Sequence, residues 1–316
     1  MISGCGMLSG GDGVPSRFRG TTALTMSFIK GLPPDEVYSP LEGELMPFQA
    51  AIEMHNQGAH DIEGGFLVFA VDEPFLRITG WDRESEVTPI GASGERIRFS
   101  LQGRSDIDPF GQNDLITVNL LPLSIGEQRV QHRSSIVATV CYPYRTELSR
   151  DVCIDTDIYG IRPTEKTCEA QDVSVSGGQG APVEVTLIEV KMLPGENYVS
   201  PQFIIHVKNS GGGQVIDPDA VSDACSSLPL TFDNVDVIDI DEVSFSRFSS
   251  RRGQIECFPE TIKLRNGQGN TRCQLRPGLM DAENIINYRT PLYIELSYGY
   301  YHTLSKEIVI RNILAE

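Results

Sequence analysis

The sequence predicts an all-β protein that consists of two tandem immunoglobulin-like antiparallel β-sandwich domains. Residues 136–154 (IVATVCYPYRTELSRDVCI) align without a gap with residues 292–310 (LYIELSYGYYHTLSKEIVI), at a constant offset of 156 and with five of nineteen positions identical. A repeat of this length indicates two copies of one domain, because solenoid repeats span about 20–50 residues. The second observation is a succession of short runs rich in β-branched and aromatic residues, with no competing helical period.

A shorter match lies early in each copy. Residues 52–58 (IEMHNQG) correspond to residues 205–211 (IHVKNSG) at an offset of 153, so both copies carry Asn-x-Gly after an apolar run. The length agrees with this division, since 316 residues correspond to two domains of about 150 residues each. We expect an N-terminal tether at 1–20, sandwiches at 21–156 and 182–316, and a Gly-containing flexible linker at 157–181.

The expected strands follow one another between Gly, Pro, Asn and Asp residues. In the first copy they are residues 23–28, 48–55, 66–71, 96–101, 115–121, 135–142 and 150–154, with a further run at 75–78. In the second copy they are residues 183–190, 202–208, 235–245, 261–264, 271–275, 292–298 and 307–311. Residues 280–286 are the one weak helical candidate. This spacing without intervening helices is typical of an antiparallel sandwich.

The repeated segment is interpreted as a hairpin with its turn near residue 147. Alternate residues of a strand share a face, and the even-numbered residues are apolar in both copies, so we place them inward. They are Ile136, Ala138, Val140, Tyr142, Val152 and Ile154, with Leu292, Ile294, Leu296, Tyr298, Ile308 and Ile310. The outer face carries Thr139 and Asp151 and is the more polar one.

The cysteine count favours disulfides. Apart from Cys5 there are six cysteines, no CxxC pair and no Cys-His pair at zinc-finger spacing. On the expected hairpin, Cys141 and Cys153 would lie opposite each other, where a cross-strand bond is geometrically allowed. The alternative, Cys153–Cys168, is favoured because it restricts more of the unfolded chain.

A second disulfide is expected in the second copy. Cys257 and Cys273 flank the turn at 265–269 and are the best candidate pair there. Cys141 and Cys225 are then left over.

The N-terminus suggests attachment to a membrane. Ile2-Ser3-Gly4-Cys5 has the form of a lipobox, in which Cys5 takes the lipid, and the Gly/Ser-rich run at 6–13 is typical of a tether. The apolar stretch of a signal peptide is missing before Cys5. The start is truncated, or it is the end of a clipped membrane-spanning helix, or the match is a coincidence. No run of 18 apolar residues occurs.

The composition limits the classes of partner that the protein is expected to bind. The net charge is −17, and no basic run is longer than Arg251-Arg252, which argues against nucleic-acid binding. We expect a protein partner or self-association at the cell surface, together with the membrane through the N-terminal anchor.

No motif of a catalytic or cofactor site is present, and no cofactor is expected. The five histidines, among them His55 and His206, form no dense ligand pattern and are interpreted as solvent-facing strand residues. The densest acidic stretch, at 233–242, could hold Ca²⁺, but a solvated strand face is favoured. Weaker acidic candidates are at 217–223 and at 106–108. The single tryptophan, Trp81, either stacks on a glycan or packs over the sandwich edge, and packing is favoured.

Several segments resemble a known family. The Asn-x-Gly run closed by a Tyr-x-Tyr segment is similar to Ig-like domains of archaeal surface proteins of the CARDB or S-layer type. Residues 18–28, 32–34, 152–155 and 178–182 resemble uncharacterised tandem Ig-like proteins of small-genome archaea. The resemblance implies a secreted or membrane-tethered β-sandwich protein without enzymatic activity, and it assigns no functional residues.

These observations predict a non-enzymatic, membrane-tethered structural or adhesive protein of the cell surface. One alternative is a subunit of an extracellular filament or lattice, in which residues 19–28 leave their own domain and add a strand to a neighbour. Another is a surface module that binds carbohydrate or Ca²⁺.

Overall fold

The fold is all-β, as predicted, and its strand pairs are antiparallel except for β2 (Glu36–Ser39), which pairs parallel to β18 (Asn287–Asn312). The structure is a computed structural model that describes residues 17–40, 45–82, 87–90, 94–126, 128–160, 165–226, 228–245, 254–280 and 287–313. The strands of the first half are β1 (Leu24–Phe28), β2 (Glu36–Ser39), β3 (Phe48–Asn56), β4 (Ile62–Val71), β5 (Leu76–Trp81), β6 (Val87–Ile90), β7 (Gly94–Leu101), β8 (Asn113–Pro122) and β9 (Gln131–Asp155).

The second half repeats this pattern with small additions. Its strands are β10 (Val173–Ser174), β11 (Val183–Pro194), β12 (Val199–Asn209), β13 (Gln214–Ile216), β14 (Val237–Phe245), β15 (Ile255–Phe258), β16 (Thr261–Lys263), β17 (Gln268–Leu275) and β18 (Asn287–Asn312). Between β13 and β14 lie the 3-10 turns Pro218–Ala220 and Phe232–Asn234 and the single-turn helix α1 (Val221–Ala224).

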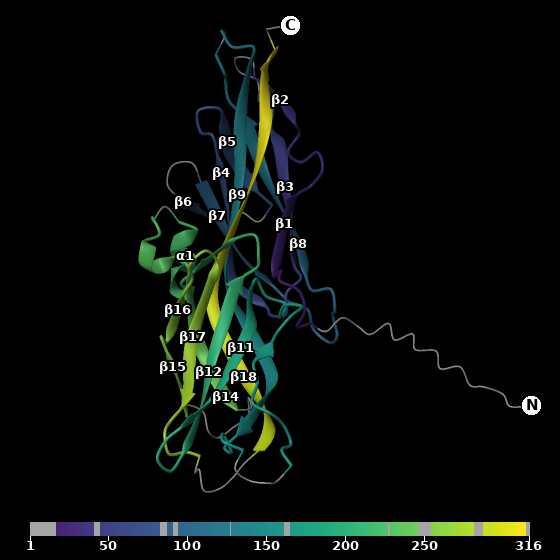
Figure 1. Cartoon of the computed structure of the whole chain (residues 1–316). Coiled ribbons are helices and arrows are strands. Elements are labelled where there is room, and N and C mark those ends of the chain that lie inside the picture. The colour runs from purple at the N-terminus through teal and green to yellow at the C-terminus, as the bar shows by residue number, and fades with distance from the viewer. Residues whose placement is uncertain are drawn as a thin grey trace, which may run out of the picture.

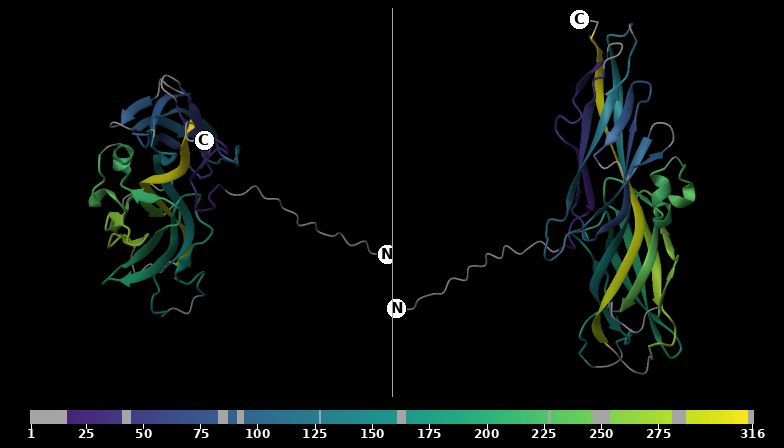
Figure 2. Two further views of the ribbon diagram at one scale, coloured as in Figure 1. Left: turned by 90° about the horizontal axis from the view of Figure 1, so that it is seen from above. Right: turned by 180° about the vertical axis from the view of Figure 1, so that it is seen from behind.

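Two sandwiches stand end to end and share one sheet (Figure 1, Figure 2). The shared sheet has nine strands, seven of them in the order β16-β14-β18-β9-β4-β7-β6, while β2 and β13 also pair with β18. A four-stranded sheet, β1-β3-β8-β5, packs on its first-half end, and a five-stranded sheet, β10-β11-β12-β17-β15, packs on its other end. We call these the first and second sandwich.

The centre of the shared sheet is a pair of very long strands. β9 has 25 residues and β18 has 26, and they pair antiparallel without a register shift from Gln131↔Arg311 to Asp155↔Asn287. Each strand begins in its own sandwich and ends in the other, which β18 shows as the yellow arrow along the molecule (Figure 1).

The predicted hairpin near residue 147 is therefore wrong. Residues 143–149 contain no Gly, Asn or Asp, although Pro143 and Ser149 are also common in turns. Each of these residues pairs with a residue of β18, so the strand continues. The predicted inward face is confirmed, because the even-numbered residues before and after 143–149 face the same side of one strand; the even-numbered Arg150 is exposed. All twelve residues placed inward are buried.

The two halves have matching topology. The order β1-β3-β8-β5 in one corresponds to β11-β12-β17-β15 in the other. The register agrees as well, since Leu24 pairs with Asn56 of the first repeat motif and Val183 pairs with Asn209 of the second. The repeat thus relates the halves by a local two-fold axis that passes between Pro143 and Gly299, which face each other.

The segment before β11 is packed, which contradicts the expectation of a flexible glycine linker. Gly178, Gln179, Gly180 and Ala181 are buried. The Gly20 N–H donates to the Gly177 C=O at 2.7 Å, and the Gly180 N–H donates to the Gly20 C=O at 2.8 Å. Glycine serves close approach here rather than mobility, because a Cβ on Gly178 would lie 2.2 Å from the Gly20 oxygen.

Other expectations have mixed outcomes. Residues 24–28 form β1 of the chain's own first sandwich. The sequence did not predict five of the observed strands, which are β2, β6, β10, β13 and β15. The helical candidate at 280–286 falls, apart from its first residue, outside the described residues. The domain limits at 21–156, 157–181 and 182–316, and the immunoglobulin type of each sandwich, stay predictions.

The crossing point allows a test of this packing. A Cβ on Gly299 would lie 2.6 Å from Val221 Cγ2 and 2.7 Å from Ile216 Cγ1. We expect Gly299→Ala to lower the free energy of unfolding by about 1–3 kcal/mol, measured by urea denaturation. Gly212→Ala is the matched control, since its Cβ would meet nothing within 4 Å. Equal stability of the two variants would contradict the close packing at the crossing.

Candidate functional site: the junction of the sandwiches

Four tyrosines meet where β9 and β18 cross between the sandwiches. Tyr142 pairs with Tyr300, and Tyr144 pairs with Tyr298. The ring centroids of Tyr142 lie 5.9 Å from those of both Tyr144 and Tyr300, and Tyr144 and Tyr298 are 6.4 Å apart. These are the two Tyr-x-Tyr segments of the repeat, so the tyrosines that are identical in both copies form one cluster.

The Asn-x-Gly motif holds the hydroxyl of one tyrosine in each half. In the first half, Asn56 Nδ2 donates to the His60 C=O at 2.9 Å, and its Oδ1 accepts from the Gly58 N–H at 3.1 Å. The turn so formed aims the His60 N–H at the Tyr144 hydroxyl, 3.1 Å away. A Cβ on Gly58 would overlap that hydroxyl, which explains why glycine is required.

The second half repeats this arrangement. Asn209 Nδ2 donates to the Gly213 C=O at 2.9 Å, and its Oδ1 accepts from the Gly211 N–H at 3.2 Å. The Gly213 N–H then donates to the Tyr300 hydroxyl at 2.7 Å. The two sequence motifs of the repeat are therefore one structural unit.

The Tyr298 hydroxyl is held by residues of β9 and β11. The Tyr298 hydroxyl lies 3.0 Å from Thr146 Oγ1 of β9 and accepts from the Val183 N–H at 3.4 Å. Burial raises the pKa of Tyr142 and Tyr298 well above the usual phenol value, and it raises the pKa of Tyr144 and Tyr300 as well. All four phenols are therefore neutral at physiological pH.

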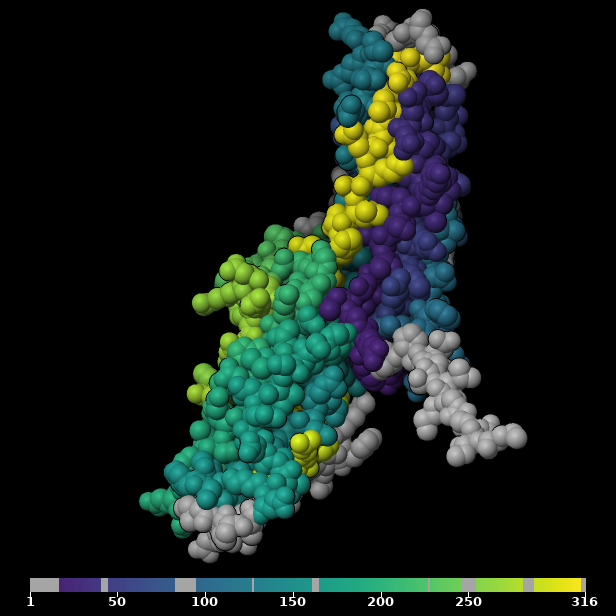
Figure 3. All heavy atoms as spheres, turned by 45° about the vertical axis from the view of Figure 1, so that its right-hand side comes forward, coloured from purple at the N-terminus to yellow at the C-terminus, as the bar shows by residue number. Residues whose placement is uncertain are grey.

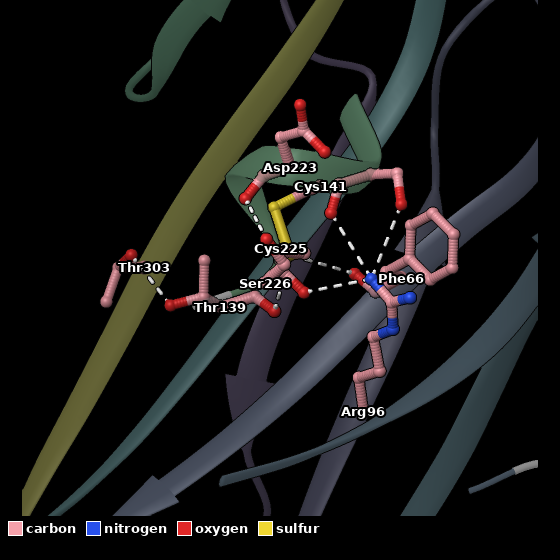
Figure 4. The surroundings of a disulfide bond; sticks show 9 residues. Phe66, Arg96, Thr139, Cys141, Asp223, Cys225, Ser226 and Thr303 are labelled. Atoms are coloured by element: carbon pink, nitrogen blue, oxygen red, sulfur yellow. Dashed lines mark hydrogen bonds between the residues drawn. A yellow bond between two sulfur atoms is a disulfide. The ribbon is translucent and has the colours of Figure 1, made fainter. Parts of the chain in front are cut away.

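A disulfide fastens the outer face of the junction. Cys141 of β9 is bonded to Cys225, which follows α1, at a sequence separation of 84 (Figure 4). The sequence assigned no partner to Cys141 or Cys225, and the structure joins these two cysteines to each other. Because α1 belongs to the second half and β9 continues the first sandwich here, this bond links the two halves covalently.

Arg96 of β7 strengthens the same contact. Its guanidinium lies 4.7 Å above the Phe66 ring. It donates to the carbonyls of Ser222 and Cys225 at 3.2 and 3.3 Å (Figure 4). A side chain of the first sandwich therefore satisfies carbonyls at the end of α1, which its own short helix leaves without partners.

The other two disulfides join the pairs that the sequence favoured. Cys153 is bonded to Cys168, and Cys257 is bonded to Cys273 between β15 and β17. The alternative pair Cys141–Cys153 does not form, because both residues lie on one continuous strand. Cys5 lies outside the described residues. Within the described part of the chain, no helix is long and apolar enough to cross a membrane.

The weaker candidates are scattered and do not form a site. Trp81 is buried against Phe69 and donates from Nε1 to Glu95, so the glycan-stacking alternative is wrong. His206 Nε2 lies 2.8 Å from Glu189 Oε1, and His55 Nε2 contacts the Phe110 carbonyl at 2.8 Å. No group of three or more metal-binding side chains occurs among the described residues.

The acidic candidates lie on a strand and in loops. Asp239 and Asp241 are on β14, and partial burial is the first cause of the raised pKa of both carboxyls. Ser297 Oγ donates to Asp241 at 2.9 Å. Asp108 and Asp217 cap their own loops by accepting backbone N–H groups at 3.0 and 2.9 Å.

Comparisons with known proteins give no family. No family model and no curated protein matches the chain. Among solved structures, the chain is similar to the C-terminal domain of the Streptococcus agalactiae AgI/II polypeptide BspA, with 7% identity and a TM-score of 0.21, over 91% of this chain and 99% of that one.

Two further structures have similar values. The C-terminal domain of the Streptococcus pyogenes antigen I/II-family protein AspA has 8% identity and a TM-score of 0.19, covering 92% of this chain and all of the other. The CupB6 tip adhesin from Pseudomonas aeruginosa has 8% identity and a TM-score of 0.17, covering 92% and 99%. These TM-scores do not establish a common topology, and the predicted archaeal resemblance stays a prediction.

The tyrosine cluster predicts a loss of stability in alkali. A phenol whose pKa is raised in the folded state stabilises the fold fully below the pKa of the unfolded chain, which is about 10. This stability is lost as the pH rises from there toward the folded pKa. We expect the urea midpoint to fall above about pH 10, together with a rise in tyrosinate absorbance. Tyr159→Phe, at an exposed site, should leave this fall unchanged. Ionisation of all ten tyrosines near pH 10 in the folded protein would contradict the expectation.

The disulfide between the halves predicts a second measurable loss. The double variant Cys141→Ser, Cys225→Ser should be less stable by about 2–4 kcal/mol, and hydrogen exchange should increase at α1. The control is Cys153→Ser, Cys168→Ser, which opens a link of only 15 residues and should leave exchange at α1 unchanged. Unaltered α1 exchange in the first variant would show that Arg96 alone holds the contact.

Proposed function

We propose that this protein is a non-enzymatic structural and adhesive element of the cell surface, which displays two sandwiches as one stiff rod. The observation that carries the proposal is the uninterrupted pairing of β9 with β18 through both sandwiches. Ordinary inter-domain linkers allow relative motion, whereas bending this rod would break backbone hydrogen bonds in a ladder about 80 Å long.

The disulfides support a location outside the cytoplasm. Six cysteines form three disulfides in the structure, and such bonds persist in oxidising compartments but are rare in the cytosol. The charge of −17 favours solubility and mutual repulsion of copies. Both properties suit a protein that works as an isolated, exposed rod.

Membrane attachment is the finer part of this proposal. The lipobox-like Ile2-Ser3-Gly4-Cys5 supports a lipid on Cys5. A clipped helix at the same place is the alternative anchor. Either would hold the rod at the surface through its N-terminal segment.

Location can be tested in the organism that encodes the protein. We expect a membrane-impermeant biotin reagent to label the protein on intact cells, and thiol trapping to detect Cys141, Cys153, Cys168, Cys225, Cys257 and Cys273 only after reduction. A cytoplasmic protein probed in parallel is the control. Protection from the reagent together with free thiols would rule out the surface location.

The anchor is tested by the same labelling. Cys5→Ser should release the labelled protein from the membrane fraction into the medium if lipid on Cys5 holds it. Retention of Cys5→Ser in the membrane would contradict the lipid anchor.

A further inference from the structure

The edge of β9 that faces away from β18 is paired only in part. β4 pairs with it from Ile136 to Cys141, and the bond from Cys153 to Cys168 covers its far end. Between these limits no strand of the described chain pairs with this edge. Unpaired N–H and C=O groups in a row are a template for a further strand.

The register shows which backbone groups point to this edge. The Asn312 N–H donates to the Val130 C=O at 2.9 Å across the ladder. In an antiparallel ladder, such bonded pairs alternate with pairs whose groups point outward. The register continues without a shift, so even-numbered residues of β9 bond to β18. The N–H and C=O groups of Ser149 and Asp151 therefore point outward.

A groove of about 770 Å³ runs along this stretch. Its walls include Phe18, Arg19 and Gly177 and, from β9, Ser149 and Arg150. In the space-filling view, the purple start of the described chain lies against the second sandwich (Figure 3). The groove thus lies beside the junction and has a backbone edge, an aromatic ring and two arginines within reach of an extended segment.

The charge of the groove is locally positive in an acidic protein. Arg19 and Arg150 line the groove together with one carboxylate, Glu147, which lies 3.4 Å from Arg145. The nearby Glu295 lies 3.7 Å from the same arginine. Among the described residues, neither Arg19 nor Arg150 has a carboxylate within ion-pair distance. An occupant that brings a carboxylate would therefore be favoured, since a partly enclosed ion pair with Arg is charge-assisted.

The first sandwich contains an internal precedent for such an occupant. Lys306 of β18 is the repeat equivalent of Arg150, and it forms an ion pair of 2.7 Å with Asp35. The Asp35 carbonyl accepts from the Val309 N–H at 2.9 Å. β2 then continues parallel to β18 from Glu36, whose carboxylate lies 2.6 Å from Arg311. An acidic extended segment therefore pairs with β18 at 309–312, next to the equivalent of the groove, and its Asp35 carboxylate reaches back to Lys306.

We propose that the groove along β9 at 147–151 binds an extended acidic peptide segment of a partner protein, added as a strand parallel to β9. A carboxylate of the peptide pairs with Arg150 as Asp35 pairs with Lys306. Its backbone bonds to the outward groups of Ser149 and Asp151, and an apolar side chain packs on Phe18. Backbone bonds supply affinity in this mode of binding, and the carboxylate supplies selectivity.

The test uses the purified full chain and a labelled peptide that copies residues 34–40 (PDEVYSP). We expect saturable binding by fluorescence anisotropy, weakened at least about tenfold, or 1.4 kcal/mol, by Arg150→Glu. Hydrogen exchange at Ser149 and Asp151 should slow when the peptide is bound. A peptide with lysine in place of both acidic residues should not bind.

Backbone pairing is tested separately from charge. Ser149→Pro removes an outward N–H at a sheet edge, where proline is tolerated, and should abolish binding, whereas Ser149→Ala should bind normally. Far-UV circular dichroism and the urea midpoint show whether Ser149→Pro folds. If it does not fold, Arg150→Glu still tests the proposal independently.

Three results would overturn the proposal. They are no saturable binding, equal binding by the chain and by Arg150→Glu, and a concentration-dependent dimer that Arg150→Glu dissociates. The last would assign the groove to a second copy. The inference deepens the adhesive proposal by naming a partner class, but binding is measured in solution. If the peptide does not bind in solution, the proposed surface location still stands. If the protein proves to be cytoplasmic, the proposed binding of a peptide in the groove still stands.

Discussion

The continuous backbone pairing of β9 with β18 is the constraint on which the rest of the structure depends. Each sandwich receives one strand of the shared sheet from the other half, since β18 ends in the first sandwich and β9 ends in the second. Neither half can therefore complete its shared sheet without the other. The halves behave as a dimer whose two subunits are joined in one chain, and the local two-fold axis through Pro143 and Gly299 is the axis of that dimer.

A ladder of this length needs its register fixed, because a shift by one residue would turn every inward side chain outward. Three independent features fix it near the axis. The Asn-x-Gly turns hold the hydroxyls of Tyr144 and Tyr300. Thr146 contacts Tyr298 across the strands. The bond from Cys141 to Cys225 then holds α1 over β9. The need to fix this register explains the position and identity of the residues in the Asn-x-Gly and Tyr-x-Tyr motifs.

The sequence predicts the class of fold, the inward face and two cysteine pairs, because each depends on local pattern: alternation of apolar residues, turn residues and spacing along the chain. The sequence does not predict the structure of a segment that depends on contacts with residues far along the chain. Tyr142 to Ser149 could be a bend or a strand by local propensity, and only pairing with β18 makes it a strand. Gly178 and Gly180 suggest mobility, yet Gly178 closely approaches Gly20 and Gly180 closely approaches Ala59. For this reason the sequence did not predict the candidate site at the junction. The feature that pointed to the site was the pair of repeat motifs, which occur at different offsets.

The orientation of the long strands has a mechanical consequence. A pull between the far ends of the two sandwiches acts along β9 and β18, and so loads their hydrogen bonds in shear. The bonds then share the force and must yield together, whereas a pull across the ladder would open them one after another. Two domains on an ordinary linker would instead transmit the force through a single extended peptide. This chain resists extension most strongly along the direction in which its two sandwiches are stacked.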